Sequence, residues 1–189
     1  YVVGGSNNDK VYLFDKDSST PLWNSDIGDT VRSVAISADG EYIVAGSNDN
    51  KVYLFDKDSS TPLWSHDTQG DILSLDISAD GQYIVVGSTT HYVYLFNKDD
   101  NGGYSWAHPV GGDVNSVSIS ADGKYIAAGS NDYSAYTFKN SLISRPSLIP
   151  VSPRNGDSTT VPTLYWFAGS DDRSNLTFDV YFGTSSTPP

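Results

Sequence analysis

Apolar residues occur along the chain in short runs that are separated by polar, glycine-containing turns. Ile72–Ser78 (ILSLDIS) alternates branched with polar residues, which predicts a β-strand. Tyr83–Ser88 (YIVVGS) and Tyr92–Phe96 (YVYLF) are apolar or aromatic at nearly every position, which is typical of strands covered on both faces. The turn Asp80-Gly81 favours a tight hairpin, because glycine accepts a positive φ without steric cost. The pattern therefore predicts an all-β chain of consecutive hairpins.

The same pattern returns at a fixed period. ISADG occurs at Ile36–Gly40, Ile77–Gly81 and Ile119–Gly123, so the period is 41 and then 42 residues. The string KVYLFDKDSSTPLW is identical at Lys10–Trp23 and Lys51–Trp64. Four strands in about 40–45 residues are the unit of a β-propeller, in which four-stranded sheets (blades) stack around an axis. We therefore expect an all-β partial β-propeller with about 3.5 four-stranded blades. A solenoid is the structural alternative, but its periods are shorter.

The strands fill two whole blades, at 31–67 and 72–108, with a three-strand piece on either side. Propellers close with about 4–8 blades, so this ring is expected to be open. Open strand edges and apolar blade faces favour pairing with further sequence or self-association between copies.

The repeats resemble two propeller families. Ser33–Asp56 is similar to the WD-repeat pattern, in which an Asp between the second and third strands buttresses the blade. Asp49 and Asp132 hold that position. Phe14-Asp15 and Phe55-Asp56 stand where that family has Trp-Asp, and its Gly-His dipeptide is absent. The resemblance implies a structural role for these residues.

The second resemblance is to quinoprotein-type (PQQ-like) propellers. Leu13–Trp23 and Leu54–Trp64 keep the Asp in third place and the final Trp of that family's docking motif. Both resemblances cover residues 1–139, and the mixture is similar to prokaryotic cell-surface propellers with YVTN-like repeats. They imply that the following residues hold blades together: Phe14, Asp15, Trp23, Phe55, Asp56, Trp64, Phe96 and Trp106.

The repeat stops after Phe138, so we divide the chain into propeller repeats (1–139), a proline-rich linker (140–161) and a further module (162–189). The last part is similar to the opening strands of a fibronectin type III or immunoglobulin-like module, with Trp166 and Tyr181 as expected core residues. Such a module needs about 100 residues, so we expect an incomplete β-sandwich-like segment.

Composition and charge exclude some classes of binding partner. The chain has 11 basic and 23 acidic residues and a net charge of −12, which argues against nucleic acid and anionic membranes as partners. No apolar run approaches the roughly 20 residues that span a bilayer, so no membrane insertion is expected. The absence of cysteine excludes disulfides, thiolate metal sites and thiol catalysis. Without methionine, and with Tyr1 inside a repeat, the sequence is expected to be a fragment.

Acidic residues recur where the first strand of each blade begins. Asp29, Asp71 and Asp113 lie on loops that form one mouth of a propeller, and loops on rigid scaffolds commonly bind partners. With Asp49 and Asp132 in the neighbouring turns, they are our binding candidates, for a protein or a glycan. The alternative is that they only terminate strands.

Metal and cofactor sites are not expected. The DKDSS runs at Asp15–Ser19 and Asp56–Ser60 lack the Gly and Glu of a calcium loop, so we interpret them as polar turns. His66 and His108 follow blade tryptophans by two residues, but their counterpart is Ser25. Together with His91 they are interpreted as surface imidazoles.

No catalytic motif is present, neither a G-x-S-x-G elbow, nor a Walker loop, nor H-E-x-x-H. The leading hypothesis is a non-catalytic binding or scaffold segment of a larger cell-surface or secreted protein. One alternative is part of a propeller enzyme, such as a quinoprotein oxidoreductase, a hydrolase or a lyase. Another is an intracellular WD-repeat adaptor.

Overall fold

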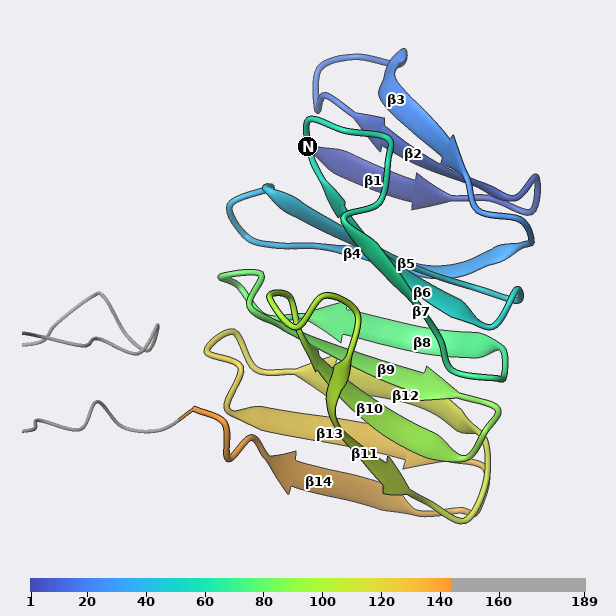
Figure 1. Ribbon diagram of the computed structural model, residues 1–189, viewed down its shortest axis with the longest axis vertical. Coiled ribbons are helices and arrows are strands. Elements are labelled where there is room, and N and C mark those ends of the chain that lie inside the picture. Colours follow the sequence, from blue (N-terminus) through green and yellow to red (C-terminus); the bar gives the residue numbers. More distant parts are fainter. Residues whose placement is uncertain (144–189) are drawn as a thin grey trace, which may run out of the picture. The chain divides into compact units, whose positions relative to one another are not determined.

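The computed structural model describes residues 1–143, which contain 14 β-strands and no helix (Figure 1). The all-β prediction is therefore confirmed for this part of the chain. The strands form four antiparallel sheets within one compact unit, Tyr1–Ser141. Sheet 1 contains β1 (Val2–Gly5), β2 (Lys10–Phe14) and β3 (Pro21–Asp26); sheet 2 contains β4 (Val31–Ile36), β5 (Tyr42–Ser47), β6 (Lys51–Asp56) and β7 (Trp64–Asp67); sheet 3 contains β8 (Ile72–Ile77), β9 (Tyr83–Ser88), β10 (Tyr92–Asn97) and β11 (Tyr104–Pro109); sheet 4 contains β12 (Val114–Ile119), β13 (Tyr125–Ser130) and β14 (Ala135–Lys139).

Each sheet follows the order of the chain, so neighbouring strands are joined as hairpins. Sheets 2 and 3 have four strands, as the repeat predicts, and even share a register shift at the same place in their first strands, at Val31/Ser33 and Ile72/Ser74. Sheet 1 begins with β1, the counterpart of β5, and sheet 4 ends with β14, the counterpart of β6. The predicted linker and the fibronectin-like module, with Trp166 and Tyr181, lie almost wholly outside the described residues.

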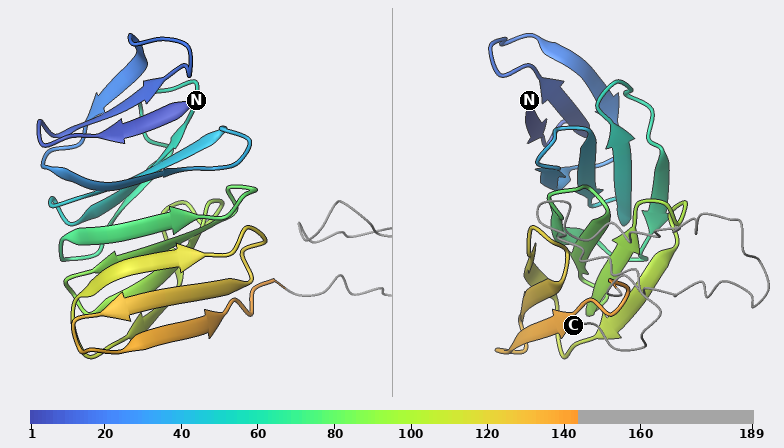
Figure 2. Two further views of the ribbon diagram at one scale, coloured as in Figure 1. Left: turned by 180° about the vertical axis from the view of Figure 1, so that it is seen from behind. Right: turned by 90° about the vertical axis from the view of Figure 1, so that its left-hand side faces the viewer.

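The sheets stack in sequence order, and their first strands lie side by side. The first strands β4, β8 and β12 contact one another in turn, and β1, the second strand of its repeat, contacts β4. Sheets 1 and 4 lie at opposite ends of the stack (Figure 2). The stack is therefore open, and no ring closes within residues 1–143. We call the face that meets the following sheet the forward face, and the opposite face the back face.

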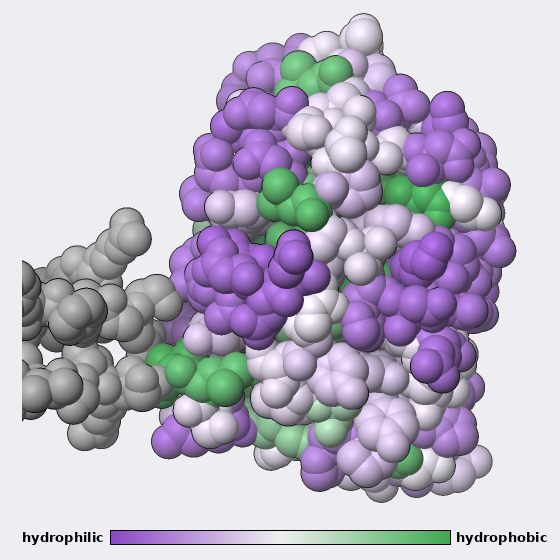
Figure 3. All heavy atoms as spheres, viewed as in Figure 1, coloured by the Kyte–Doolittle hydropathy of each residue, from purple (hydrophilic) through white to green (hydrophobic). Residues whose placement is uncertain are grey.

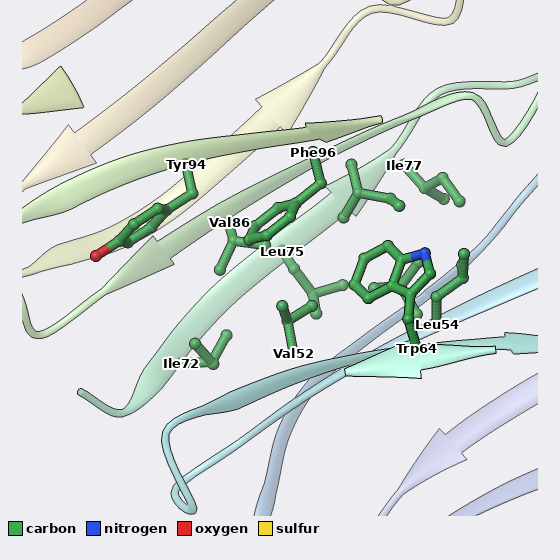
Figure 4. Packing of buried hydrophobic residues seen from close by; sticks show 11 residues of the cluster. Val52, Leu54, Trp64, Ile72, Leu75, Ile77, Val86, Tyr94 and Phe96 are labelled. Atoms are coloured by element: carbon green, nitrogen blue, oxygen red, sulfur yellow. The ribbon is translucent and has the colours of Figure 1, made fainter. Parts of the chain in front are cut away.

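Alternating side chains supply both faces. In sheet 2, Val44, Val52 and Leu54 point forward and are fully buried against sheet 3, where Leu75 and Phe96 meet them (Figure 4). A second cluster lies between sheets 1 and 2 and is built in the same way. It contains Val11, Leu13, Ile27, Val31, Ile43, Ala45, Tyr53 and Phe55.

Two tryptophans attach successive sheets to each other. The indole N–H of Trp23 donates to the carbonyl oxygen of Lys57 at 2.7 Å, and that of Trp64 donates to Lys98 at 2.9 Å. Their rings also contact the buried Phe55 and Phe96 of the following sheet, at 5.5 and 5.7 Å between centroids. These are residues for which the family resemblances imply a role in holding blades together.

Glycines in the second strands allow the sheets to approach closely. A Cβ on Gly87 would lie 2.6 Å from Val114 Cγ1 and 2.8 Å from the Val114 carbonyl oxygen. Gly46 meets Ile72 in the same way. The counterpart Gly129, on sheet 4, has only Ser116 nearby, at 4.0 Å. The same sequence position is therefore crowded inside the stack and open at its end.

Replacing Trp64 by Phe should destabilise the protein by about 1–3 kcal/mol, because the Lys98 carbonyl loses its donor at a largely buried site. Trp106→Phe is the matched control, since its indole N–H has no hydrogen-bond partner within residues 1–143, although its ring contacts Phe138. Chemical unfolding of both variants measures the difference. Equal losses would contradict the proposed role of the hydrogen bond.

Replacing Gly87 by Ala should lower the free energy of unfolding by more than about 1 kcal/mol, because the new methyl group overlaps the Val114 backbone. Gly129→Ala should be neutral or stabilising by about 0.4–1 kcal/mol, because it reduces the entropy of the unfolded chain without a clash. Thermal unfolding of the two variants provides the test. A strong loss in Gly129→Ala would mean that another surface covers sheet 4.

Candidate functional site

The predicted binding residues belong to one end of the strands. Because the strands alternate in direction, the loops between sheets (27–30, 68–71 and 110–113) lie at the same end as the turns between second and third strands (6–9, 47–50, 88–91 and 130–133). We call this the loop end. The opposite Asp-Gly end carries the SADG turns. Figure 3, viewed from the same side as Figure 1, shows hydrophilic residues toward both sides of the molecule, with paler residues between them.

Asp49 and Asp132 are held by their own turns. The Asp49 carboxylate accepts hydrogen bonds from the Lys51 N–H at 3.0 Å and from the Tyr53 hydroxyl, and its side chain is only 16% exposed. Asp132 accepts from the Ser134 N–H at 3.0 Å, and also from Gly111 N–H and the Tyr136 hydroxyl. The structure thus places both carboxylates in supporting contacts.

This pairing of a turn residue with a tyrosine four positions later occurs in all four sheets. The Asn8 side-chain amide donates to the Tyr12 hydroxyl at 2.8 Å, and Thr90 pairs with Tyr94 at 3.0 Å. The Tyr53 hydroxyl also lies 3.1 Å from the Ile27 carbonyl, which belongs to the loop arriving from sheet 1. The tyrosine therefore connects its own turn with the preceding inter-sheet loop.

Burial, followed by the hydrogen bond and charge of Asp49, raises the pKa of Tyr53 well above its usual value. The hydrogen bond from Tyr136 is the largest of the effects that lower the pKa of Asp132. Both shifts keep the tyrosine protonated and the carboxylate charged, which is the combination that this contact requires. Sequence reasoning did not find the pairs because the tyrosines look like ordinary core residues.

The other three candidates lie directly before the first strands of sheets 2, 3 and 4. Asp29 accepts from the Thr30 N–H at 2.6 Å, and its side chain is exposed. Asp71 has no hydrogen-bond or ion-pair partner for its carboxylate within residues 1–143. Asp113 lies 3.3 Å from Nε2 of His91, on the turn of the preceding sheet. These carboxylates repeat from sheet to sheet: Asp29 is exposed, and Asp71 and Asp113 are half-buried.

The other two histidines pack against aromatic rings rather than facing a metal. His66 contacts Phe96 and His108 contacts Phe138 edge-on, at 5.2 and 5.0 Å between centroids. No group of three His, Cys, Asp or Glu side chains suited to a metal occurs within the described chain.

The DKDSS turns use their oxygens internally. Asp15 and Asp56 each accept the N–H of the residue two positions later, at 2.9 Å. Their serines accept from Thr20 and Thr61 in the same way, at 3.1 Å in both turns. This is the geometry of a capped polar turn, which agrees with the interpretation made from the sequence.

The two ends differ in how much the repeats vary. At the Asp-Gly end the three turns between first and second strands all read SADG, and Ser78 and Asp80 show why. The serine hydroxyl donates to the carboxylate at 2.6 Å, and the serine oxygen and that carboxylate oxygen each accept a backbone N–H. At the loop end the turns read SNND, SNDN, STTH and SNDY. Their fourth residues share a left-handed backbone, with φ between 66° and 72°; they are Asp9, Asn50, His91 and Tyr133.

At that fourth position the contact that repeats between sheets is made by the backbone and not by the side chain. The carbonyl groups of Asp9, Asn50 and His91 accept an N–H from the inter-sheet loop, at 2.9, 2.9 and 2.8 Å. Tyr133 is fully exposed, at 102%. Four chemically different side chains are thus presented from one repeated backbone position, which sequence reasoning missed because positive φ cannot be read from these residue types.

Within the described residues there is no helix of the length and apolarity that a membrane span requires. The model of one protein family, described as Family of unknown function (DUF5711), matches residues 3–144 of the 189. No curated protein matches the chain. The match covers all four sheets.

Raising the pH from about 9 to about 11 should lower the free energy of unfolding, and Tyr53→Phe should weaken this dependence. The folded pKa of Tyr53 lies above the value near 10 of an unfolded tyrosine, so the stabilisation is complete below that pH. Above it the unfolded chain loses the proton first. Tyr125→Phe is the control, because Tyr125 is 60% exposed and its hydroxyl has no hydrogen-bond partner in residues 1–143. Urea unfolding at each pH provides the measurement, and identical slopes for both variants would contradict the assignment.

Proposed function

The chain belongs to the DUF5711 family, and we propose that it is a non-catalytic binding scaffold whose loop end holds a protein or a glycan. In this proposal the four sheets are consecutive blades of a β-propeller in a larger cell-surface or secreted protein. The side-by-side first strands and the two tryptophan links support the propeller arrangement.

One observation carries the proposal: the turns between second and third strands, at the loop end, differ in all four sheets, while the three SADG turns at the opposite end are identical. The buried core faces of sheets 2 and 3, Trp23 and Trp64, and the SADG turns recur because each has a packing or hydrogen-bonding task. The loop end keeps a repeated backbone but changes its exposed side chains. A rigid scaffold with variable polar loops is the usual architecture of a recognition surface.

The charges at this end favour a partner that donates hydrogen bonds. Asp29 is exposed, the half-buried Asp71 has no carboxylate partner within residues 1–143, and Asp113 has His91 and the Asn131 amide beside it. Lys and Arg side chains of a protein, or the hydroxyl groups of a glycan, are suitable donors to carboxylate oxygens. The net charge of −12 also favours encounter with basic partners.

The test begins with the full chain immobilised and probed with a glycan array and a panel of extracellular proteins. For any ligand that binds saturably, the triple variant Asp29→Asn, Asp71→Asn, Asp113→Asn should weaken affinity about tenfold or more, because charged hydrogen bonds contribute about 1.5–3 kcal/mol.

The matched control is Asp17→Asn, Asp58→Asn, Asp99→Asn, which removes the same charge from turns at the opposite end. Binding of this variant should equal that of the unmodified chain. Equal weakening by both variants would show a non-specific charge effect. That result, or the absence of any saturable ligand, would refute the proposal.

A further inference from the structure

The turn between β10 and β11 differs from its counterparts in sheets 1 and 2. Those two turns read DKDSSTP, whereas sheet 3 has NKDDNGGY, with one residue more before the fourth strand. At its tip Asn101 and Gly102 have φ angles of 53° and 85°, and the Gly103 N–H donates to the Asp100 carbonyl at 3.0 Å. These are the features of a type I′ hairpin turn, for which Asn-Gly is a preferred sequence. Sheet 3 therefore carries an Asn-Gly pair that the other two turns lack.

The two groups that can react with each other in this pair are both free of hydrogen bonds. Asn101 is exposed, and its carboxamide has no hydrogen-bond partner within residues 1–143. The Gly102 N–H has none in that part of the chain either. Because glycine has no Cβ, nothing on Gly102 shields its nitrogen from the Asn101 side chain, and its backbone is free to adjust. No hydrogen bond of the scaffold has to be broken to use either group.

Other asparagines of residues 1–143 lack this combination. Asn48 and Asn131 lie in loop-end turns, but the residue after each carries a side chain, and its N–H donates to a serine hydroxyl, at 3.1 and 3.3 Å. Asn140 is buried, and its amide donates to a backbone carbonyl at 3.1 Å. Asn101 is the single asparagine followed by glycine within residues 1–143. A second pair, Asn155-Gly156, lies outside the described residues.

The reaction open to such a pair is cyclisation. The Gly102 nitrogen attacks Cγ of Asn101, an N–Cγ bond forms, the nitrogen gives its proton to a base in the solvent, and the side-chain amide leaves as ammonia. The attack joins neighbouring residues, so it is intramolecular. Water then opens the succinimide ring: addition at Cγ gives aspartate, and addition at the backbone carbonyl carbon gives isoaspartate. The net change is asparagine plus water to aspartate or isoaspartate plus ammonia, and no other reactant is needed.

The same turn holds the preceding sheet. The Lys98 carbonyl accepts the indole N–H of Trp64 at 2.9 Å. A Cβ on Gly102 would lie 3.1 Å from the Ser65 carbonyl oxygen and 3.5 Å from Trp64 Cβ, and Gly102 is buried although its two neighbours are exposed. In isoaspartate the backbone runs through the side chain and is longer by one methylene, which a close-packed contact does not absorb without a shift. Isoaspartate at position 101 therefore displaces Gly102 from β7.

We propose that Asn101 is a site of spontaneous modification through a succinimide, and that its isoaspartyl product loosens the contact between the β10–β11 turn and sheet 2. The aspartyl product keeps the normal backbone path. It adds a charge beside Asp99 and Asp100 but does not displace Gly102. The site lies at the Asp-Gly end, so the proposal is independent of the ligand at the loop end.

The first test incubates the full chain at mildly alkaline pH and follows its tryptic peptides by mass spectrometry. We expect the peptide of residues 99–124 to gain the mass of an amide-to-acid change and to separate into two products, both modified at residue 101. Asn115 is the internal control, because it is exposed in the same peptide but is followed by Ser116. An unchanged Asn101 after a free peptide of residues 97–106 has fully reacted, or an equal rate at Asn115, would overturn the proposal.

The second test separates the effects of the two products. Chains with isoaspartate at position 101 are isolated by chromatography and compared with Asn101→Asp, which has the same charge and the normal backbone. Hydrogen exchange of β7 should be several-fold faster in the isoaspartyl chain and unchanged in Asn101→Asp. The counterpart β3, which faces a DKDSS turn, is the internal reference and should exchange equally in every form. Unchanged exchange of β7 in the isoaspartyl chain, or an equal increase in Asn101→Asp, would refute the proposed loosening.

Discussion

The structure depends on apolar packing between successive sheets. Leu54 and Phe55 are neighbours on β6, and both are fully buried, yet one faces sheet 3 and the other faces sheet 1. Because side chains alternate across a strand, a middle strand of this composition cannot be satisfied by a single neighbour. A lone sheet would expose both of its apolar faces, so the sheets are stable only as a stack. The tryptophan hydrogen bonds, the close glycines and the tyrosine contacts at the turns all act on interfaces that this packing creates.

The repeated features were predictable because the same physical task recurs in every period. The strands, the SADG hairpins and the four-stranded sheets follow from hydrophobic patterning and turn chemistry alone. The candidate site was harder to predict from the sequence. Asp49 and Asp71 look equivalent in the sequence, as acidic residues beside a strand, but a tyrosine hydroxyl donates to the first, and the second has no carboxylate partner within residues 1–143. The contact between His91 and Asp113 joins two different repeats, so no local pattern could indicate it. Repeat counting predicted the four-stranded sheets, but no ring closes within residues 1–143.

The two ends of the stack are chemically different. On the forward face of sheet 4, Ala127, Ala135 and Thr137 stand where sheet 2 has two valines and a leucine. The back face of sheet 1 instead keeps Tyr12 and Phe14, the aromatic pair that is covered in sheets 2 and 3. Terminal units of stacked repeats commonly carry a less apolar outer face, because that face has no neighbour to bury it. The forward face of sheet 4 fits this description and the back face of sheet 1 does not, so the stack has a direction.

The two ends of the strands, the Asp-Gly end and the loop end, differ in which atoms stabilise the scaffold. At the Asp-Gly end the Ser78 hydroxyl and one Asp80 carboxylate oxygen both form hydrogen bonds, so a change in either residue would cost hydrogen bonds in the scaffold. At the fourth turn position of the loop end the scaffold uses the backbone carbonyl, and a left-handed non-glycine residue costs about 1–2 kcal/mol. Asn and Asp tolerate that conformation best, yet His91 and Tyr133 adopt it too. The fold accepts this conformational cost in two sheets, and the fully exposed Tyr133 makes no packing contribution. The cost is better explained by what these side chains present to solvent than by what they contribute to the core.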